Sequence, residues 1–270
     1  MILVNGQAAQ SIGVTDRAVQ FGDGVFETIA VAEGQALCLD EHLQRLQQGC
    51  QRLQIQAVDL EPIRADINSV IARQPDCIIK LIVSRGESAQ GYAVPTDIRA
   101  TRIVSGSAWP TAGFADSLRV CLCQTRLGQN PQLAGIKHLN RLEQVLARRE
   151  VDLHNCDEGV VLDNIGNVIE GTGSNLFLLL EGQLVTPDLE QCGIAGIVRG
   201  KILNLAGELG LQAVVRQVQV QELQQASEMF FCNSIRGIQS VAEYAGQALP
   251  QSTTAEQIRA ALIDRQVIRG

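Results

Sequence analysis

The first hundred residues alternate between strand-like and helix-like hydrophobic patterns. Apolar residues 2–4 lead into Asn5-Gly6, a dipeptide typical of a two-residue hairpin turn. After Asp40, which we interpret as a helix cap, apolar residues recur at helical spacing: Leu43, Leu46, Cys50 and Leu53. A second helix is expected from Pro62 to about Gln74. The strands expected around these helices are 2–4, 25–31, 36–39, 77–84 and 100–105.

The rest of the chain is richer in short strands. Strands are expected at 118–123, 159–162, 168–170, 175–180, 183–185, 214–218 and 229–232. Helices are expected at 140–151, 196–209 and 254–263. Because strands and helices mix without strict alternation, the pattern favours an α+β fold in two parts over a doubly wound parallel sheet.

Charge disappears between residues 105 and 115, where Gly, Ser and Pro crowd together. Such composition is typical of a connection between compact parts of a chain. The sequence therefore predicts a smaller N-terminal α+β domain at 1–108, a linker at 109–115 and a larger C-terminal domain at 116–270.

Composition narrows the class of protein. The chain has 270 residues, 46% of them apolar, so it can bury a sizeable core. Its net charge of −7 argues against nucleic acid as a partner, although a local arginine cluster can still bind a small anion. The start of the chain lacks the features of a signal peptide, and no apolar stretch is long enough to span a membrane.

The cysteines are numerous but scattered. The eight of them form no Cys-x-x-Cys motif, and the three histidines are not spaced to join them as metal ligands. Several cysteines lie in apolar strand-like runs, where the side chain acts as a small hydrophobe. We therefore expect no metal site and a reduced, cytoplasmic environment.

The most informative segment surrounds Lys137. Helical spacing predicts a helix from Asn140, with Asn140 as N-cap and Glu143 completing a capping box. Lys137 then precedes a positive helix end and has Ile136 beside it, and both features disfavour its charged form. A lysine that loses its proton readily can form a Schiff base and carry protons. The alternative is a surface lysine beside a helix.

Three other segments combine small, polar and charged residues more than a core requires. Asp23 lies between two glycines at the start of an apolar strand, an arrangement that an ordinary turn also explains. Arg45 suits phosphate binding, or it lies with His42 and Arg52 on a solvated helix face. Glu170 precedes Gly-Thr-Gly-Ser and suits a cationic ring nitrogen beside a flat ligand, or it is the exposed acid of a hairpin turn.

Two further segments are candidate anion sites. Residues 193–199 open a helix whose first N–H groups can bind phosphate. Residues 232–236 close a strand with the amide of Asn233 and the hydroxyl of Ser234. Each segment also has an ordinary interpretation, as a helix cap or a strand end.

Taken together, these motifs resemble a known family, the fold-type IV pyridoxal-phosphate enzymes. The motifs that carry the resemblance, in chain order, are Phe21-Gly22-Asp23-Gly24, Ser84-Arg85-Gly86, the segment around Lys137, Glu170-Gly-Thr-Gly-Ser-Asn-Leu-Phe and residues 196–199. The resemblance covers residues 5 to about 240. The run Ile-Lys-His-Leu-Asn-Arg-Leu-Glu-Gln is most similar to the members that cleave 4-amino-4-deoxychorismate.

The resemblance implies roles for the motif residues. Lys137 would bind pyridoxal 5'-phosphate as a Schiff base and move protons, and Glu170 would pair with the pyridine nitrogen. Thr28 would face the substrate. The phosphate would be held by Arg45, the backbone N–H groups of Ile197 and Val198, and the segment Asn233-Ser234. The family also implies a cofactor in a cleft between the smaller N-terminal and the larger, cofactor-binding C-terminal domain, and a homodimer.

The implied reaction is the conversion of 4-amino-4-deoxychorismate to 4-aminobenzoate and pyruvate, a step of folate biosynthesis. One departure bears on the substrate, because these lyases often have Gly-Arg-Gly-Tyr where this chain has Ala89-Gln90-Gly91-Tyr92. Arg85 and Arg102 are candidates for the missing charge. Two alternatives remain: an aminotransferase acting on D-amino or branched-chain amino acids, and a catalytically silent protein that binds the cofactor or keeps only the fold.

Overall fold

The chain folds into two compact units in this computed structural model, which describes residues 1–56, 58–115, 117–250 and 252–270. Unit 1 consists of Met1–Thr111 and Ile136–Asn140, and unit 2 of Ala112–Gly135 and Arg141–Gly270. Residue 116, where the C-terminal domain is expected to begin, lies outside the described residues. The expected α+β class is confirmed. Within the described ranges, no helix has the length and apolar character needed to cross a bilayer.

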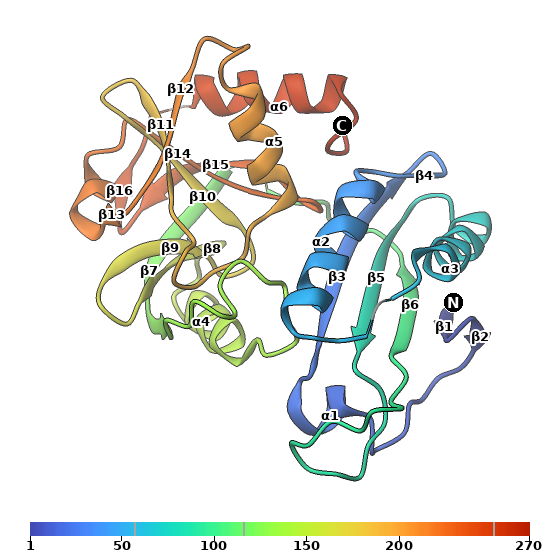
Figure 1. The fold of residues 1–270 in the computed structure, drawn as a ribbon. Helices are drawn as coiled ribbons and strands as arrows, with labels where there is room; N and C mark the ends of the chain where they lie inside the picture. Colours follow the sequence, from blue (N-terminus) through green and yellow to red (C-terminus); the bar gives the residue numbers. More distant parts are fainter. Residues whose placement is uncertain (57, 116, 251) are drawn as a thin grey trace. The chain divides into compact units, whose positions relative to one another are not determined.

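Unit 1 is an antiparallel sheet packed against helices (Figure 1). The strand order is β2-β1-β6-β5-β3-β4. The strands are β1 (Ile2–Val4), β2 (Gln7–Ala8), β3 (Gly24–Ala32), β4 (Gln35–Ala36), β5 (Cys77–Ser84) and β6 (Thr101–Ser107). The helices are α1 (Arg17–Phe21), α2 (Leu39–Arg52) and α3 (Leu60–Arg73). The hairpin at Asn5-Gly6 is confirmed, since Val4 pairs with Gln7.

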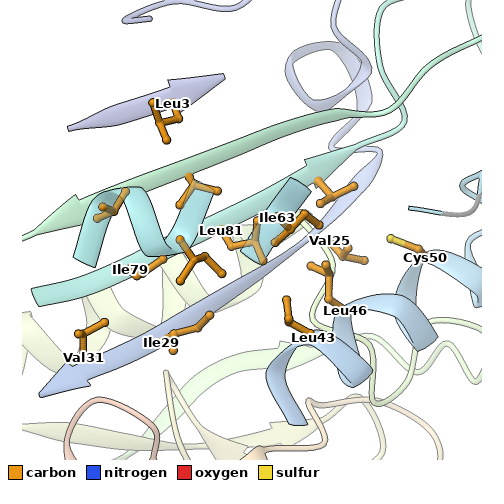
Figure 2. Packing of buried hydrophobic residues seen from close by; sticks show 14 of the residues in the cluster. Leu3, Val25, Ile29, Val31, Leu43, Leu46, Cys50, Ile63, Ile79 and Leu81 are labelled. Carbon is orange, nitrogen blue, oxygen red and sulfur yellow. The ribbon is translucent and has the colours of Figure 1, made fainter. Parts of the chain in front are cut away.

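The core of unit 1 lies between this sheet and its helices. Leu43 and Leu46 of α2 belong to the same buried cluster as Ile79 and Leu81 of β5 (Figure 2). The expected apolar face of α2 is therefore confirmed, but the predicted cap is wrong. The N-cap is Cys38, and Asp40 belongs to the first turn, where a carboxylate suits the positive end of the helix.

Unit 2 is built on a larger mixed sheet with the order β12-β11-β10-β14-β15-β7-β8-β9-β13, and β16 pairs with β15. Its first strands are β7 (Ser117–Leu127), β8 (Glu158–Asp163), β9 (Asn167–Gly171), β10 (Asn175–Leu180) and β11 (Gln183–Pro187). The later ones are β12 (Gln212–Arg216), β13 (Val218–Gln219), β14 (Glu228–Asn233), β15 (Gly237–Tyr244) and β16 (Gln247–Ala248). The helices are α4 (Leu142–Leu153), α5 (Ile197–Leu205), the 3-10 helix η1 (Val220–Gln224) and α6 (Thr253–Asp264).

The helix after Lys137 differs from the sequence-based prediction. It is α4, and its N-cap is Arg141, with no side-chain capping bond. The Asn140 side chain instead donates to the Gly22 carbonyl (3.0 Å), and the Glu143 carboxylate accepts the Gly128 N–H (2.9 Å). The predicted capping box was therefore wrong, because both side chains bond to distant backbone groups.

Candidate functional site

Lys137 is held at the edge of the unit 1 sheet. Residues 136–139 run beside the start of β3: the Phe26 N–H donates to the Lys137 carbonyl (2.9 Å), and the Leu139 N–H donates to the Gly24 carbonyl (3.0 Å). Gly24 is required at a crowded point, since an added Cβ would lie 2.5 Å from a backbone carbonyl oxygen of β5. The backbone that carries the lysine is therefore fixed by two hydrogen bonds to β3.

The Lys137 amine shares an aromatic ring with a second lysine. Its Nζ lies 4.3 Å from the centroid of the Phe26 ring, and the Nζ of Lys80 lies 3.5 Å from the same centroid. Both distances are within the range of cation–π attraction. The ring of Phe26 thus brings two amines together beside β3.

Lys80 belongs to a polar row across the unit 1 sheet. It pairs in register with Thr28 on β3 and with Ser105 on β6, so these three side chains point to the same side of the sheet. Partial burial lowers the pKa of Lys80 to about 8, although the charge of Glu27 opposes that shift. Among the residues that the structure describes, no carboxylate lies within ion-pair distance of the Lys80 amine.

Sequence reasoning missed Lys80, although a signal was present. It is a single charged residue inside the otherwise apolar run of β5, and charged side chains are rarely placed in such a strand. Its alignment with Thr28 depends on the pairing register of β3 and β5. A shift by one residue would have put it on the opposite face, and the sequence alone does not fix that register.

Arg45 lies on α2 beside a buried acid. Its Nε and one Nη donate to the Glu27 carboxylate (2.7 and 2.5 Å), and the same carboxylate is 2.6 Å from Nδ1 of His42. The solvated helix face considered for Arg45 and His42 is wrong, because His42 is buried and the arginine side chain is only 13% exposed.

The carboxyl group of Glu27 is ionised at neutral pH. Burial alone would raise the pKa of Glu27, but the charge of Arg45 and hydrogen bonds from His42 and Arg45 outweigh burial and lower it to about 2. A carboxyl group with a lowered pKa contributes stability at neutral pH that is lost as the pH falls from about 4.5 toward 2. Glu27 therefore orients the Arg45 guanidinium as a charged pair at neutral pH.

The two arginines considered for the substrate are engaged inside unit 1. Arg85 pairs with Asp23 through Nε (2.7 Å) and donates to two backbone carbonyls just after α2 (both 2.7 Å). Arg102 pairs with Asp66 (2.7 Å). Both guanidinium groups are thus bound within the protein. We therefore assign neither of them to a substrate carboxylate.

In unit 2, Glu170 lies near the end of a buried strand and is itself buried. Its Oε2 accepts the N–H of Ile194 (2.9 Å), and the residue is only 4% exposed. The interpretation of Glu170 as an exposed turn acid is therefore wrong. Burial lowers the pKa of the nearby Arg141, but the charge of Glu170 opposes that shift. A buried carboxylate that interacts with cations is suited to pair with a protonated ring nitrogen.

A short bonded path joins Glu170 to the segment that carries the lysine. Ile194 forms a parallel bridge with Gly135, and the Gly135 N–H donates to the Gly193 carbonyl (2.9 Å). Lys137 follows Gly135 by two residues, which is at most about 7.6 Å along the backbone. Chain continuity alone therefore keeps the lysine backbone near the segment that bonds to Glu170.

The N-terminus of α5 has the features of an anion site. Its N-cap is Gly196, which provides no side-chain capping bond. Within the described part of the chain, no protein group accepts from the first helical N–H groups, those of Ile197 and Val198. A Cβ on Gly196 would lie 2.0 Å from the side-chain oxygen of Asn175, so the backbone comes close to that residue of β10.

The end of β14 lies beside the same strand. Asn175 pairs with Cys232, two residues before Ser234. The hydroxyl of Ser234 forms no hydrogen bond within the described ranges, so it is open to a ligand. The side chain of Asn233, in contrast, is hydrogen-bonded within the protein. Its oxygen accepts hydrogen bonds from two backbone N–H groups of the following turn, and its NH2 group donates to the Gly173 carbonyl. These bonds shape the turn that carries Ser234, and the direct contact of Asn233 with a cofactor stays a prediction.

One further residue was missed by sequence reasoning. Glu158, at the start of β8, is 1% exposed and accepts the N–H of Thr172 (2.9 Å) and the hydroxyl of Ser174 (3.0 Å). It also accepts the Thr172 hydroxyl, and Arg236 lies 3.6 Å from it. This carboxylate supports the turn just after Glu170. Its local sequence carried no sign of that role, because the bonded residues follow it by 14 and 16 positions.

These residues fit a flat, phosphorylated, cationic ring. Unit 2 offers a buried carboxylate for a ring nitrogen, the first N–H groups of α5 and a hydroxyl for a phosphate, and glycines where a side chain would intrude. A Cβ on Gly193, for example, would approach an oxygen of Glu170 to 3.4 Å. Unit 1 offers the amine of Lys137 on the Phe26 ring. Taken separately, the unit 2 groups suit the ring nitrogen and phosphate of pyridoxal phosphate, and the unit 1 amine suits its aldehyde.

The α+β fold is that of a class of pyridoxal-phosphate enzymes that includes lyases and aminotransferases. The chain belongs to the class IV aminotransferase family, whose sequence model matches residues 24–244. The match begins at Gly24 of β3 and ends at Tyr244 of β15, so it includes both Lys137 and Glu170.

Several relatives are similar over nearly the whole chain. The solved structure of 4-amino-4-deoxychorismate lyase from Pseudomonas aeruginosa is 40% identical, covers 99% of this chain and 100% of its own, and gives a TM-score of 0.93. Aminodeoxychorismate lyase from Vibrio harveyi is 33% identical over 93% of both chains. A putative branched-chain-amino-acid aminotransferase from Methanocaldococcus jannaschii is 29% identical over 91% of this chain and 86% of its own.

Proposed function

We propose that this protein is a pyridoxal-phosphate-dependent lyase that converts 4-amino-4-deoxychorismate to 4-aminobenzoate and pyruvate. The observation that carries the proposal is the bonded path from the buried Glu170 through Ile194 to Gly135, two residues before Lys137. This path supports the binding of a cofactor that requires both a carboxylate and an amine. The choice of substrate is supported by the two lyases that resemble the chain over nearly its full length.

Five groups would bind the ring and phosphate of the cofactor. Glu170 would pair with the ring nitrogen, and the N–H groups of Ile197 and Val198 with the Ser234 hydroxyl would bind the phosphate. Arg45 is proposed as a further phosphate ligand, held in one orientation by the buried acid of β3. When bound, the cofactor supplies an electron sink that stabilises negative charge on the substrate carbon bearing nitrogen.

Lys137 and Thr28 would act as the acid–base groups that transfer protons to and from the substrate. The Lys137 Nζ, released when the substrate amine binds, takes a proton from the carbon that carries the substrate nitrogen. It then returns a proton to the departing enolpyruvyl group, with the hydroxyl of Thr28 as a second donor. A well-placed acid–base group of this kind typically contributes about 10²–10⁴ in rate. Aromatisation of the product makes the overall reaction favourable.

Amino-group transfer is the second candidate function. It is favoured by the similarity to a putative branched-chain-amino-acid aminotransferase and by Gln90, which replaces the arginine often found in the lyases. The same lysine would serve, but the proton would return to the cofactor and no enolpyruvyl group would leave.

Product analysis separates the two functions. Purified holoenzyme incubated with 4-amino-4-deoxychorismate should release 4-aminobenzoate and pyruvate in equal amounts. Incubation with D-alanine or leucine and 2-oxoglutarate tests for amino transfer. Glutamate formation without 4-aminobenzoate would overturn the lyase assignment, and neither product from a holoenzyme would favour a silent cofactor-binding protein.

Lys80 is proposed to bind a substrate carboxylate. Its amine contacts the same Phe26 ring as the Lys137 amine and has no ion-pair partner within the described residues. It thus supplies a positive charge that Arg85 and Arg102, both bound within unit 1, do not.

Lys80→Met should raise KM about 10–100-fold and change kcat much less, because a charged hydrogen bond to the substrate contributes about 1.5–3 kcal/mol. Since the pKa of Lys80 is about 8, the amine is charged below that pH and neutral above it. The wild-type KM should therefore rise as the pH increases through 8. Lys80→Arg, which stays charged, should remove that rise. A pH-independent wild-type KM would contradict the assignment.

We also propose that the protein is a homodimer, and that the outer face of α4 lies in its interface. Leu142, Val145, Leu146 and Leu153 recur at helical spacing and are 55–78% exposed, whereas the helix buries Ala147 and Val151 in its own unit. An exposed cluster of apolar residues on one helix face is typical of a protein–protein contact. A second copy of the chain is the occupant that the family implies.

The double variant Leu142→Glu/Val145→Glu should be a monomer. Light scattering after size exclusion should give a mass near 29.1 kDa, where the wild type gives about twice that value. Val215→Glu is the control, because it places one such negative charge on an exposed apolar residue of β12 and should leave the mass unchanged. A wild type that is monomeric at micromolar concentration would refute the proposal.

A further inference from the structure

Arg236 lies in the turn that carries Ser234, the residue proposed to bind the cofactor phosphate. This turn joins β14 to β15, and the Asn233 side chain holds it: its oxygen accepts the Arg236 N–H (2.7 Å), and its NH2 group donates to the Gly173 carbonyl (3.1 Å). Gly173 follows Glu170 by three residues. The turn that carries Arg236 is therefore bonded to the turn that follows the proposed partner of the ring nitrogen.

The guanidinium of Arg236 has two neighbours, and neither of them satisfies its hydrogen-bond donors. Its Nη1 lies 3.6 Å from the Glu158 carboxylate, which is longer than a hydrogen bond, and its central carbon lies 5.7 Å from the centroid of the Phe114 ring. Within the residues that the structure describes, no acceptor is hydrogen-bonded to this guanidinium. The side chain is 32% exposed, so a ligand can reach it.

The neighbouring acid does not need the donors of Arg236. The Glu158 carboxylate already accepts the N–H groups of Gly159 (3.0 Å) and Thr172 (2.9 Å), and it also accepts two hydroxyl groups of the same turn. It attracts the guanidinium by charge from the Nη1 side. The edge formed by Nε and the other Nη is left for a second acceptor, and an arginine edge of this kind can bind a carboxylate through two parallel hydrogen bonds.

An aromatic ring lies beside this guanidinium and is held close to it. Phe114 precedes Ala115, whose carbonyl accepts a hydrogen bond from the Gln239 side chain (2.6 Å). Gln239 is buried on β15 and follows Arg236 by three residues. A ring within about 6 Å attracts the cation and shields it from water on that side. Because less water surrounds it, the guanidinium attracts an anion more strongly.

We propose that the Arg236 guanidinium binds a carboxylate of the substrate. The inference rests on the proposed function, whose products, 4-aminobenzoate and pyruvate, each carry one carboxylate, so the substrate carries two. Lys80 is proposed to bind one of them, and Arg236 supplies the cation for the other. Arg199, on the first turn of α5, is already engaged, because it donates to the Thr186 hydroxyl (3.2 Å) and the Pro187 carbonyl (3.0 Å).

Arg236→Gln should raise the KM for 4-amino-4-deoxychorismate by about 10–100-fold and change kcat much less. The carboxylates take no part in bond breaking, so this contact is present equally before and during the reaction. Arg236→Lys keeps a positive charge beside Glu158 but loses the two-pronged edge. Its Tm should therefore equal that of the wild type, and its KM should lie between those of the wild type and Arg236→Gln.

Arg119→Gln is the matched control. Arg119 is another arginine of unit 2, its side chain is 57% exposed, and its guanidinium lies 3.9 Å from the Asp157 carboxylate. It thus has a similarly loose ion pair, but it lies on β7 and not in the turn that carries Ser234. Its substitution should leave KM and kcat unchanged.

Two further measurements separate substrate binding from other roles of Arg236. Titration of the apoenzyme with pyridoxal phosphate should give the same dissociation constant for the wild type and Arg236→Gln. Weaker cofactor binding by the variant would assign the guanidinium to the phosphate and overturn the proposal. A lower Tm of Arg236→Gln with an unchanged KM would also overturn it, because Arg236 would then serve only to balance the charge of Glu158.

Calorimetric titration of the holoenzyme with each product identifies the carboxylate. Arg236→Gln should weaken the binding of either 4-aminobenzoate or pyruvate by about 10-fold or more, and Lys80→Met should weaken the binding of the other. A wild type that releases no 4-aminobenzoate would overturn the lyase assignment alone. Equal binding of both products by the wild type and Arg236→Gln, or weakening of the same product by both variants, would overturn the assignment of Arg236 to the second carboxylate.

Discussion

Lys137→Ala should abolish turnover of 4-amino-4-deoxychorismate, with a loss of more than about 10⁴-fold in kcat. A single acid–base group contributes up to about 10⁴ in rate, and this substitution also removes the proposed covalent attachment of the cofactor. The backbone bonds of Lys137 to β3 do not involve its side chain, so the fold should remain. Initial rates of 4-aminobenzoate formation, with circular dichroism as a check of folding, measure the effect.

Two variants separate proton transfer from charge. Lys137→Arg keeps a positive charge near the Phe26 ring but cannot lose a proton at neutral pH, so it should be as inactive as Lys137→Ala. Lys201→Ala, on α5, is the control lysine and should retain activity. In the wild type, borohydride should fix pyridoxal phosphate on the peptide that holds Lys137. Normal turnover by Lys137→Ala, or a fixed cofactor on another lysine, would contradict the mechanism.

Periodicity predicted the α4 helix well but could not predict the direction of its apolar face. Leu142, Val145 and Leu146 have the spacing of a buried helix stripe, yet they are exposed, and the helix packs through Ala147 and Val151. Hydrophobic spacing shows that a helix is amphipathic, not what covers its apolar side. In a protein that forms an oligomer, that side can belong to the partner.

Local motifs predicted candidate chemistry but not the partners of each side chain. Arg45 was recognised as an anion-binding type of residue, but its ion pair with Glu27 links positions 18 residues apart on a strand and a helix. The same holds for Asn140 and Glu143, which have a plausible capping spacing but bond to distant backbone groups. Such pairings depend on tertiary packing, which overrides local preferences.

The role of Glu158 in holding the turn after Glu170 was the feature least evident from the sequence. The residues that were found most readily, Lys137 and Glu170, lie in sequence motifs that resemble those of a known family. Glu158 lies at the start of an apolar strand, and nothing near it in sequence indicates that it holds the turn after Glu170. Its importance follows only from its burial and its bonds.

Glu158→Ala should be the most destabilising of the substitutions considered. The carboxylate is buried and accepts the N–H groups of Gly159 and Thr172 and the hydroxyls of Thr172 and Ser174, with Arg236 at 3.6 Å. Its removal leaves these donors and a cation without an acceptor. Removing one partner from such a buried charged network lowers the free energy of unfolding by about 3–5 kcal/mol. In a chain of this size the expected fall in Tm is about 10 °C, measured by calorimetry.

The conservative variant Glu158→Gln should lose less, about 1–3 kcal/mol, because the amide keeps one acceptor oxygen while its NH2 group faces Arg236. Glu190→Ala, an exposed acid of the same unit, is the control and should change stability by less than about 0.5 kcal/mol. A Tm for Glu158→Ala equal to that of the control would show that the network contributes nothing.

The same substitution tests whether the turn and the acid act together. Since Thr172 and Ser174 closely follow Glu170, loosening their turn should also weaken pyridoxal phosphate binding, measured by titration of the apoenzyme well below the lowered Tm. Glu170→Gln should weaken binding with a smaller fall in Tm, since the amide oxygen can still accept the Ile194 N–H. If Glu158→Ala lowers Tm but binds the cofactor as the wild type does, the position of Glu170 does not depend on this turn, and Glu158 serves stability alone.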